Sequence, residues 1–156
     1  MNSDFKDLLQ IFAEEQVEYL VVGAYAVIHY TQPRYTKDID LWIRPSVENA
    51  ERVARAFRRF GVPFIEVTQD DFAREGLQYV IGVSPCQIDF LTSLPGAPDF
   101  ETAWKSRATG TGEGIPIHFL GKADLIIAKQ TAGRLQDLAD IEEIQRAEAA
   151  EGTAAD

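Results

Sequence analysis

Residues 21–43 read VVGAYAVIHYTQPRYTKDIDLWI and decide the fold class. An apolar, β-rich segment at 18–22 leads into Gly23, which ends a predicted buried strand. The next residues, 24–30, are predicted to form a short helix held close to that strand. Residues 36–43 (TKDIDLWI) then alternate polar and apolar side chains, as a strand does. Strand, glycine turn, helix and strand in this order indicate an α/β (α+β) domain.

Helices and strands are predicted on both sides of that stretch. The spacing of apolar residues predicts helices over 3–16, 48–60, 121–130 and 135–148, the last two hinged near Gly133. Short β-rich runs predict strands over 77–83, 87–91 and 115–120, the first two paired as an antiparallel hairpin. Residues 92–114 carry glycines at 110, 112 and 114 and are expected to form loops, with a short helix near 99–105.

Length and composition fit one globular domain. The chain has 156 residues, of which 46% are hydrophobic and 26% charged. We predict a single domain over residues 1–148, followed by a small acidic tail, disordered, over 149–156. Cys86 is the single cysteine and the longest apolar run is far below the roughly 20 residues of a membrane helix. We therefore expect a cytoplasmic protein without a membrane partner.

The charge balance limits the kind of ligand. Lys and Arg number 15 and Asp and Glu number 25, which gives a formal net charge of −10. A protein that coats nucleic acid by charge alone needs a basic surface, so this class is disfavoured. A small polyanion such as a nucleotide remains compatible, because metal ions and a few local cations can meet its charge.

Three aspartates carry the strongest chemical signal. Asp38 and Asp40 stand at positions i and i+2 of a predicted strand and so project from one face. Asp89 lies in a second predicted strand, between apolar neighbours, where an unpartnered carboxylate is costly. Carboxylates held together repel unless a cation lies between them, and Mg²⁺ favours such oxygen ligands. The trio is therefore predicted to bind two Mg²⁺ or Mn²⁺ ions, an arrangement used for in-line displacement.

An Asp-x-Asp pair alone more often marks a strand end or a capping residue. The surrounding pattern adds specificity, because Val22-Gly23-Ala24 is followed after thirteen residues by Asp38-Ile39-Asp40-Leu41. This arrangement resembles the signature of the DNA-polymerase-β-type nucleotidyltransferases. Residues 21–43 and the ending DLIIAKQTAGRLQDLADIEEI (124–144) are similar to the branch of AbiEii-like toxin nucleotidyltransferases and their uncharacterised bacterial relatives.

The resemblance implies a fold and a reaction. The fold is a nucleotidyltransferase fold, with a mixed β-sheet flanked by helices and a C-terminal helical pair. The reaction is metal-dependent transfer of a nucleoside monophosphate from an NTP donor to a hydroxyl acceptor, which could be an RNA 3′ end, a protein or a small molecule. By the same resemblance, Asp38 and Asp40 bind both metals. Asp89 holds the catalytic metal and helps to deprotonate the acceptor.

The resemblance also assigns residues to the nucleotide. The backbone N–H groups of Gly23 and Ala24 approach the triphosphate at a helix start, where anions are favoured. Ala24 stands where the signature usually has Gly or Ser. Lys129 contacts the triphosphate, with Arg134 and Asp137 in support.

Two further cations, Arg34 and Lys37, precede the acid pair. A guanidinium at this position could bind phosphate in a bidentate manner, and both residues are therefore candidates for nucleotide binding. The alternative is that they only neutralise the acids.

Two function classes lead at this point, and a solute-binding or structural α/β domain with a fortuitous acid cluster is a third possibility. The first is an enzyme, a nucleotidyltransferase and possible toxin–antitoxin component with an antitoxin or a second copy as partner. The second is a non-catalytic domain on the same scaffold that senses nucleotides or binds a partner. The presence of all three acids favours the enzyme.

Overall fold

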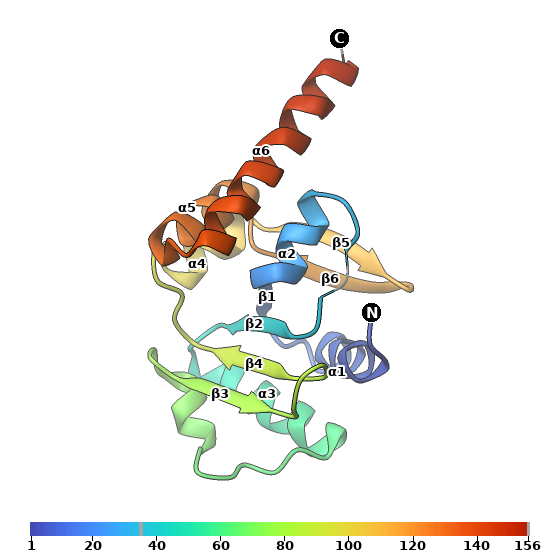
Figure 1. The fold of residues 1–156 in the computed structure, drawn as a ribbon. Helices are drawn as coiled ribbons and strands as arrows, with labels where there is room; N and C mark the ends of the chain where they lie inside the picture. Colours follow the sequence, from blue (N-terminus) through green and yellow to red (C-terminus); the bar gives the residue numbers. More distant parts are fainter. Residues whose placement is uncertain (35, 156) are drawn as a thin grey trace.

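The computed structural model describes residues 1–34 and 36–155, which form a six-stranded mixed sheet flanked by helices (Figure 1). The α-helices are α1 (Ser3–Glu14), α2 (Gly23–Tyr30), α3 (Val47–Phe60), α4 (Phe100–Lys105), α5 (Lys122–Ala132) and α6 (Leu135–Ala155). The strands are β1 (Tyr19–Val22), β2 (Ile39–Ile43), β3 (Gln78–Ile81), β4 (Ile88–Leu91), β5 (Ala108–Gly112) and β6 (Ile115–Phe119). This architecture confirms the predicted fold class.

The strand order is β3-β4-β2-β1-β6-β5. β1 is antiparallel to β2 and parallel to β6, while β2 is parallel to β4. β3 and β4 form the predicted antiparallel hairpin. In this register Val22 lies opposite Asp40, and Asp40 lies opposite Asp89. The centre of the sheet therefore brings the glycine turn and two of the acids together.

Side chains on the two faces of the sheet differ in character. Leu41 and Phe90 are register partners and are fully buried on the face covered by α1 and α3. Phe90 packs there against Phe12 of α1 and Phe57 of α3. Because side chains alternate along a strand, Asp40 and its partner on β4 project from the opposite face.

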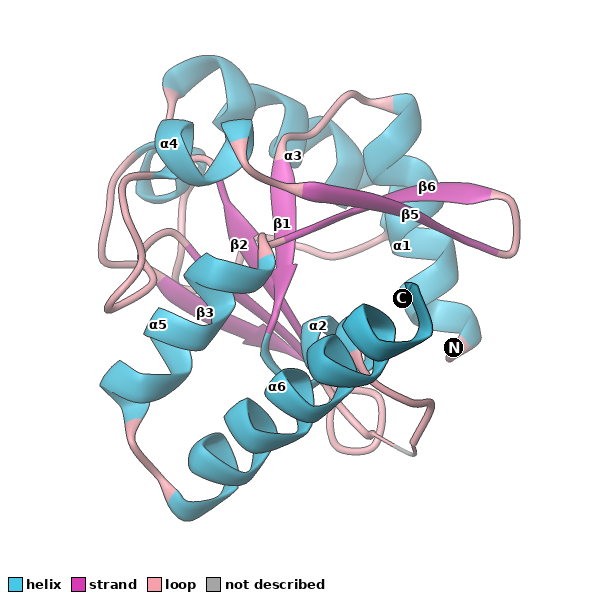
Figure 2. Ribbon diagram, turned by 90° about the horizontal axis from the view of Figure 1, so that it is seen from above, coloured by secondary structure: helices cyan, strands magenta, loops and turns pink. Residues whose placement is uncertain are grey.

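That opposite face is next to α2, α5 and α6, which contact one another (Figures 1 and 2). Gly133 separates α5 from α6 in a left-handed conformation with φ of 66°, so the predicted hinge is confirmed. The distal part of α6 projects beyond the rest of the molecule (Figure 1). Where the sequence predicted a disordered tail over 149–156, α6 continues through Ala155, in keeping with the helix-forming Ala and Glu residues there. Asp156 lies outside the described residues.

The predicted loop at 92–114 contains a strand that the sequence did not indicate. Residues 108–112 (ATGTG) form β5 at the sheet edge, antiparallel to β6. Glu113 and Gly114 both have positive φ and make the turn between these strands. Gly110 and Gly112 thus lie in a strand, because pairing with β6 outweighs their weak strand propensity.

Among the described residues, no helix combines the length and apolar character that crossing a lipid bilayer requires.

Candidate active site

Asp40 of β2 and Asp89 of β4 form an acid pair at the centre of the sheet. They are direct register partners in the parallel ladder, so their side chains leave the same face next to each other. Burial, followed by the charge and hydrogen bond of Asp89 and a smaller contribution from Asp38, raises the pKa of Asp40 to about 7. The positive charge of Lys129 opposes this shift only in part. The Asp40–Asp89 pair therefore has too little positive charge nearby to balance two ionised carboxylates.

Gly23 lies directly against this acid pair. Its φ is +66°, a region that residues with a side chain rarely adopt. A Cβ built on Gly23 would lie 2.2 Å from Oδ2 of Asp40, so only glycine fits here. No side chain caps the N-terminus of α2, which begins at Gly23. The first N–H groups of this helix, including that of Ala24, are therefore available to an anion beside Asp40.

Asp38 lies just before β2 rather than within it, because the strand begins at Ile39. Its carboxylate accepts a hydrogen bond from the backbone N–H of Gln87 at 3.3 Å, and the side-chain amide of Gln87 donates to Asp89 at 2.9 Å. Gln87 thus links the outer two acids of the predicted trio.

The side chains described hold no group of three or more His, Cys, Asp or Glu residues arranged for a metal ion. Metal binding by Asp38, Asp40 and Asp89 therefore stays a prediction. Two properties of the residues present fit a hard divalent cation. All three candidate ligands offer carboxylate oxygens, and the burial and neighbouring Asp89 that raise the pKa of Asp40 are both offset by a nearby cation.

A cavity of about 190 Å³ opens beside Asp40 and Gly23. It is also lined by Lys129 of α5 together with Arg134 and Asp137. Aliphatic side chains line the remainder, namely Val22, Leu91, Leu94, Leu125, Ala128 and Ala132. Its volume is below the roughly 300–1,000 Å³ of sites that enclose a whole ligand, so a nucleotide here would extend onto the open surface.

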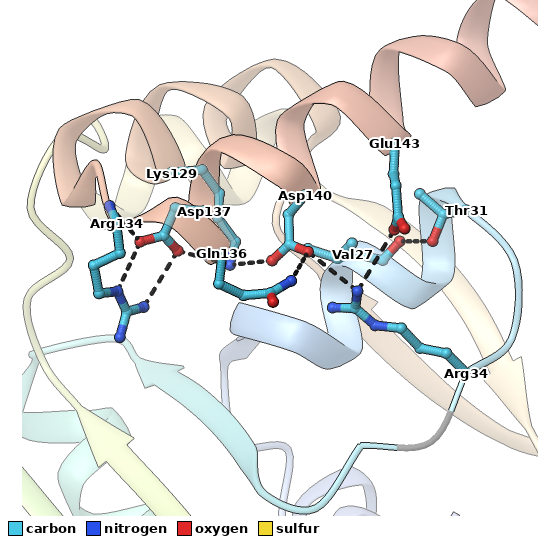
Figure 3. Close-up of polar contacts among 9 residues, drawn as sticks. All are labelled: Val27, Thr31, Arg34, Lys129, Arg134, Gln136, Asp137, Asp140 and Glu143. Carbon is cyan, nitrogen blue, oxygen red and sulfur yellow. Dashed lines mark hydrogen bonds and ion pairs between the residues drawn. The ribbon is translucent and has the colours of Figure 1, made fainter.

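Lys129 is a buried cation between two buried acids of α6 (Figure 3). Its Nζ donates to Oδ1 of Asp137 at 3.1 Å and to Oδ2 of Asp140 at 3.0 Å. The exposed fraction is 8% for Lys129 and 1% for each aspartate, so the three charges are compensated within the protein. The predicted triphosphate-binding lysine is thus held at the cavity by two carboxylates.

Arg134 completes the charge balance at Asp137. Its Nε and one terminal nitrogen donate to the Asp137 carboxylate at 2.7 and 3.2 Å, and its backbone N–H donates at 3.1 Å. These bonds, with that of Lys129, lower the pKa of Asp137 to about 2 although burial opposes the shift. Asp137 therefore holds cations in place, and a bound phosphate would meet those cations rather than this carboxylate.

The structure places Arg34 and Lys37 in different surroundings. Arg34 pairs with Asp140 at 3.1 Å and with Glu143 at 3.5 Å, both on α6, so it contacts α6 and not the Asp38–Asp40 pair (Figure 3). Lys37 is exposed, and the structure gives it no ion pair with any of the described residues. Neither cation neutralises the acids through a direct ion pair, and their contact with phosphate stays a prediction.

Asp140 is a residue that the sequence analysis did not place at the site. It accepts hydrogen bonds from Lys129, Arg34 and Gln136. A signal was present, because Asp137, Asp140, Ile141 and Ile144 follow the i, i+3, i+4, i+7 spacing of a buried helix face. Two acids on such a face require buried cationic partners.

Comparison with known proteins agrees with the fold. The fold is similar to that of the antibiotic-resistance factor ANT(2'')-Ia, whose solution structure matches with a TM-score of 0.53 at 12% sequence identity. The match covers 98% of this chain and 91% of that chain, and at this identity it concerns the fold alone. The six-stranded mixed sheet with its flanking helices is thus a nucleotidyltransferase-like fold.

The chain belongs to the family described as "Nucleotidyltransferase of unknown function (DUF6036)", whose sequence pattern matches residues 3–149. No curated protein matches the chain.

Proposed function

We propose that the protein transfers a nucleoside monophosphate from an NTP to a hydroxyl acceptor, with Mg²⁺ or Mn²⁺ bound at Asp38, Asp40 and Asp89. The observation that carries the proposal is the Asp40–Asp89 pair, with Gly23 against Asp40 and a cavity opening beside them. Membership in a nucleotidyltransferase family supports the same reaction class.

Two divalent ions at such a site supply positive charge to the reacting phosphate and to the attacking and leaving oxygens. The side chains of Asp40 and Asp89 hold these ions, and Asp38 adds a third carboxylate. Their mutual repulsion in the ion-free protein is the reason they bind cations well, because binding removes an unfavourable interaction.

In the transfer step, the oxygen of the acceptor hydroxyl forms a bond to the α-phosphorus. The bond between that phosphorus and the oxygen bridging to the β-phosphate breaks, so pyrophosphate leaves and the monophosphate remains on the acceptor. Asp89 takes up the hydroxyl proton as the bond forms. Positioning and charge stabilisation supply the rate enhancement in this class of reaction.

The triphosphate is held by groups at both sides of the cavity. The N–H groups of Gly23 and Ala24 bind phosphate oxygens at the start of α2. Lys129 and Arg134 provide positive charge from α5 and from the turn before α6. Arg34, anchored beside α6, and the exposed Lys37 provide further contacts to phosphate.

The finer classification follows the sequence resemblance. We propose that the protein lies close to the AbiEii-like toxin branch and acts as a toxin–antitoxin component, with an antitoxin or a second copy as partner. The acceptor is an RNA 3′ end, a protein hydroxyl or a small molecule.

The test is transfer of label from α-³²P-labelled NTPs. Each of the four NTPs is incubated with Mg²⁺ and one of three acceptors: an RNA oligonucleotide with a free 3′ hydroxyl, a Ser/Thr-rich protein, or a small polyol. The expected result is label on one acceptor class and no transfer from γ-labelled NTP. In Asp40→Asn the rate of transfer is expected to fall by at least about 10³-fold.

Asp70→Asn is the matched control, since Asp70 is exposed in the short 3₁₀ helix Gln69–Ala73, outside the site. Transfer that persists in Asp40→Asn, or NTP binding without transfer to any of the three acceptors, would favour the non-catalytic domain that senses nucleotides or binds a partner.

A further inference from the structure

The carboxylate of Asp140 is shared between two cations from distant parts of the chain. Its Oδ2 accepts from Lys129 at 3.0 Å, while its Oδ1 accepts from Arg34 at 3.1 Å and from Gln136 at 2.7 Å (Figure 3). Burial raises the pKa of Asp140, but the hydrogen bonds from Lys129 and Gln136 outweigh it and the net shift is downward. A buried, ionised bridge therefore joins α5, α6 and the segment before β2.

This bridge limits the directions that the Lys129 ammonium can take. An ammonium has three N–H donors, and Asp137 and Asp140 accept two of them. One donor remains, and Lys129 lines the cavity that also contains Asp40. A lysine side chain is long and flexible, so two fixed carboxylates define its orientation before any ligand arrives.

The geometry points to Asp140 as a positioning residue, which directs the third N–H of Lys129 into the nucleotide cavity. The inference rests on the proposed function, because it assigns Lys129 to the triphosphate. Asp140 itself is 1% exposed and has both oxygens occupied by protein groups, so it acts through Lys129.

Glu143 provides a matched control one turn further along α6. It also pairs with Arg34, at 3.5 Å, but its side chain is 45% exposed and the ion pairs of Lys129 do not include it. Asp140→Asn and Glu143→Gln each remove one carboxylate charge from Arg34. Of the two variants, only Asp140→Asn removes a carboxylate that also holds Lys129.

The first measurement is NMR of the protein with ¹⁵N-labelled lysine, without nucleotide or metal. In the parent, the Lys129 ammonium is expected to give a slowly exchanging ¹⁵Nζ signal, assigned by its absence in Lys129→Met. Asp140→Asn is expected to broaden or remove that signal, whereas Glu143→Gln leaves it in place. A protected Lys129 signal in Asp140→Asn would overturn the inference, since the lysine would then be held without Asp140.

The second measurement is a double-mutant cycle on label transfer. Asp140→Asn is expected to lower kcat by about 10- to 100-fold, the size of loss that a small misplacement of a reacting group causes. Glu143→Gln should change kcat less than 3-fold. In a Lys129→Met background, Asp140→Asn should add less than 3-fold, because its effect passes through the lysine.

The outcomes separate this inference from the proposed function. If Asp140→Asn and Lys129→Met lower kcat independently and their effects multiply, Asp140 does not act through Lys129 and the inference fails. If the parent transfers no label and binds no NTP, the proposed function fails, while the NMR result still decides whether Asp140 orients Lys129. Circular dichroism and thermal unfolding of each variant separate loss of folding from loss of positioning.

Discussion

Two groups of charged side chains lie over the same face of the sheet, and they differ in how far their charges are balanced. In the α5–α6 network, Lys129, Arg34 and Arg134 face Asp137 and Asp140, and every charge has a partner. At the Asp40–Asp89 pair, two carboxylates meet each other, and the pKa of Asp40 rises to about 7.

The difference separates scaffold from ligand site. A balanced network contributes to the folded state, because each carboxylate has hydrogen-bonded cations and its pKa is lowered. An unbalanced acid pair destabilises the folded state until a cation arrives. Removing a charge from the acid pair should therefore raise the stability of the folded protein, whereas removing a charge from the balanced network should lower it.

The largest change in stability is expected from Gly23→Ala, which disturbs the acid pair. An alanine would have to adopt a positive φ and would place its Cβ 2.2 Å from Oδ2 of Asp40. The expected cost is about 2–3 kcal/mol, or roughly 5–10 °C in Tm. Thermal unfolding measures this cost. Gly61→Ala is the control for the positive φ alone, because Gly61 has φ of +85° and no atom lies within 4 Å of its Cβ position. Equal effects at both positions would contradict the close contact with Asp40.

The next effect is expected from Lys129→Met, which removes the central cation of the balanced network. Asp137 keeps Arg134 and Asp140 keeps Arg34, so the loss should be about 2 kcal/mol rather than the roughly 3–5 kcal/mol of a fully orphaned buried charge. Urea denaturation measures it. A variant as stable as the parent would show that the network does not hold α5 and α6 together.

The smallest expected effect concerns Asp137 and the pH dependence of the free energy of unfolding. Hydrogen bonds from Arg134 hold the pKa of Asp137 at about 2, below its ordinary value, so its ionised form stabilises the folded protein above about pH 4. That stability, about 1 kcal/mol because Arg134 is largely exposed to solvent, is lost as the pH falls from 4 to 2. Urea denaturation of the parent and Asp137→Asn should differ at pH 7 and converge near pH 2. A constant difference would rule out ionisation as the cause.

The sequence was sufficient to predict the local structure and the part of the site around Gly23 and Asp40. Alternation around Asp40, the glycine after β1 and the apolar spacing of the helices depend on neighbours close in the chain, so they could be predicted. The edge strand β5 could not, because its threonines and glycines become a strand only through pairing with β6.

The rest of the site depends on contacts between residues that are far apart in the sequence. Asp89 meets Asp40 because β4 pairs in parallel with β2 in one particular register. Arg34 reaches Asp140 across 106 positions of sequence, which no local pattern encodes. The two acids on the buried face of α6 did indicate a buried cation, although their spacing alone could not identify Lys129 or Arg34.

The most direct test of the central claim, that Asp40 and Asp89 form an unbalanced pair that binds metal and nucleotide, is the thermal unfolding of the parent and Asp40→Asn at pH 8. Each protein is measured alone and with each NTP, with and without Mg²⁺. Without ligand, Asp40→Asn should unfold a few degrees higher, because a repulsive charge is removed. With Mg²⁺ and NTP near 100 times Kd, the parent should gain about 2.7 kcal/mol and the variant nothing. A variant that is no more stable and keeps the Mg²⁺-dependent gain would contradict the claim.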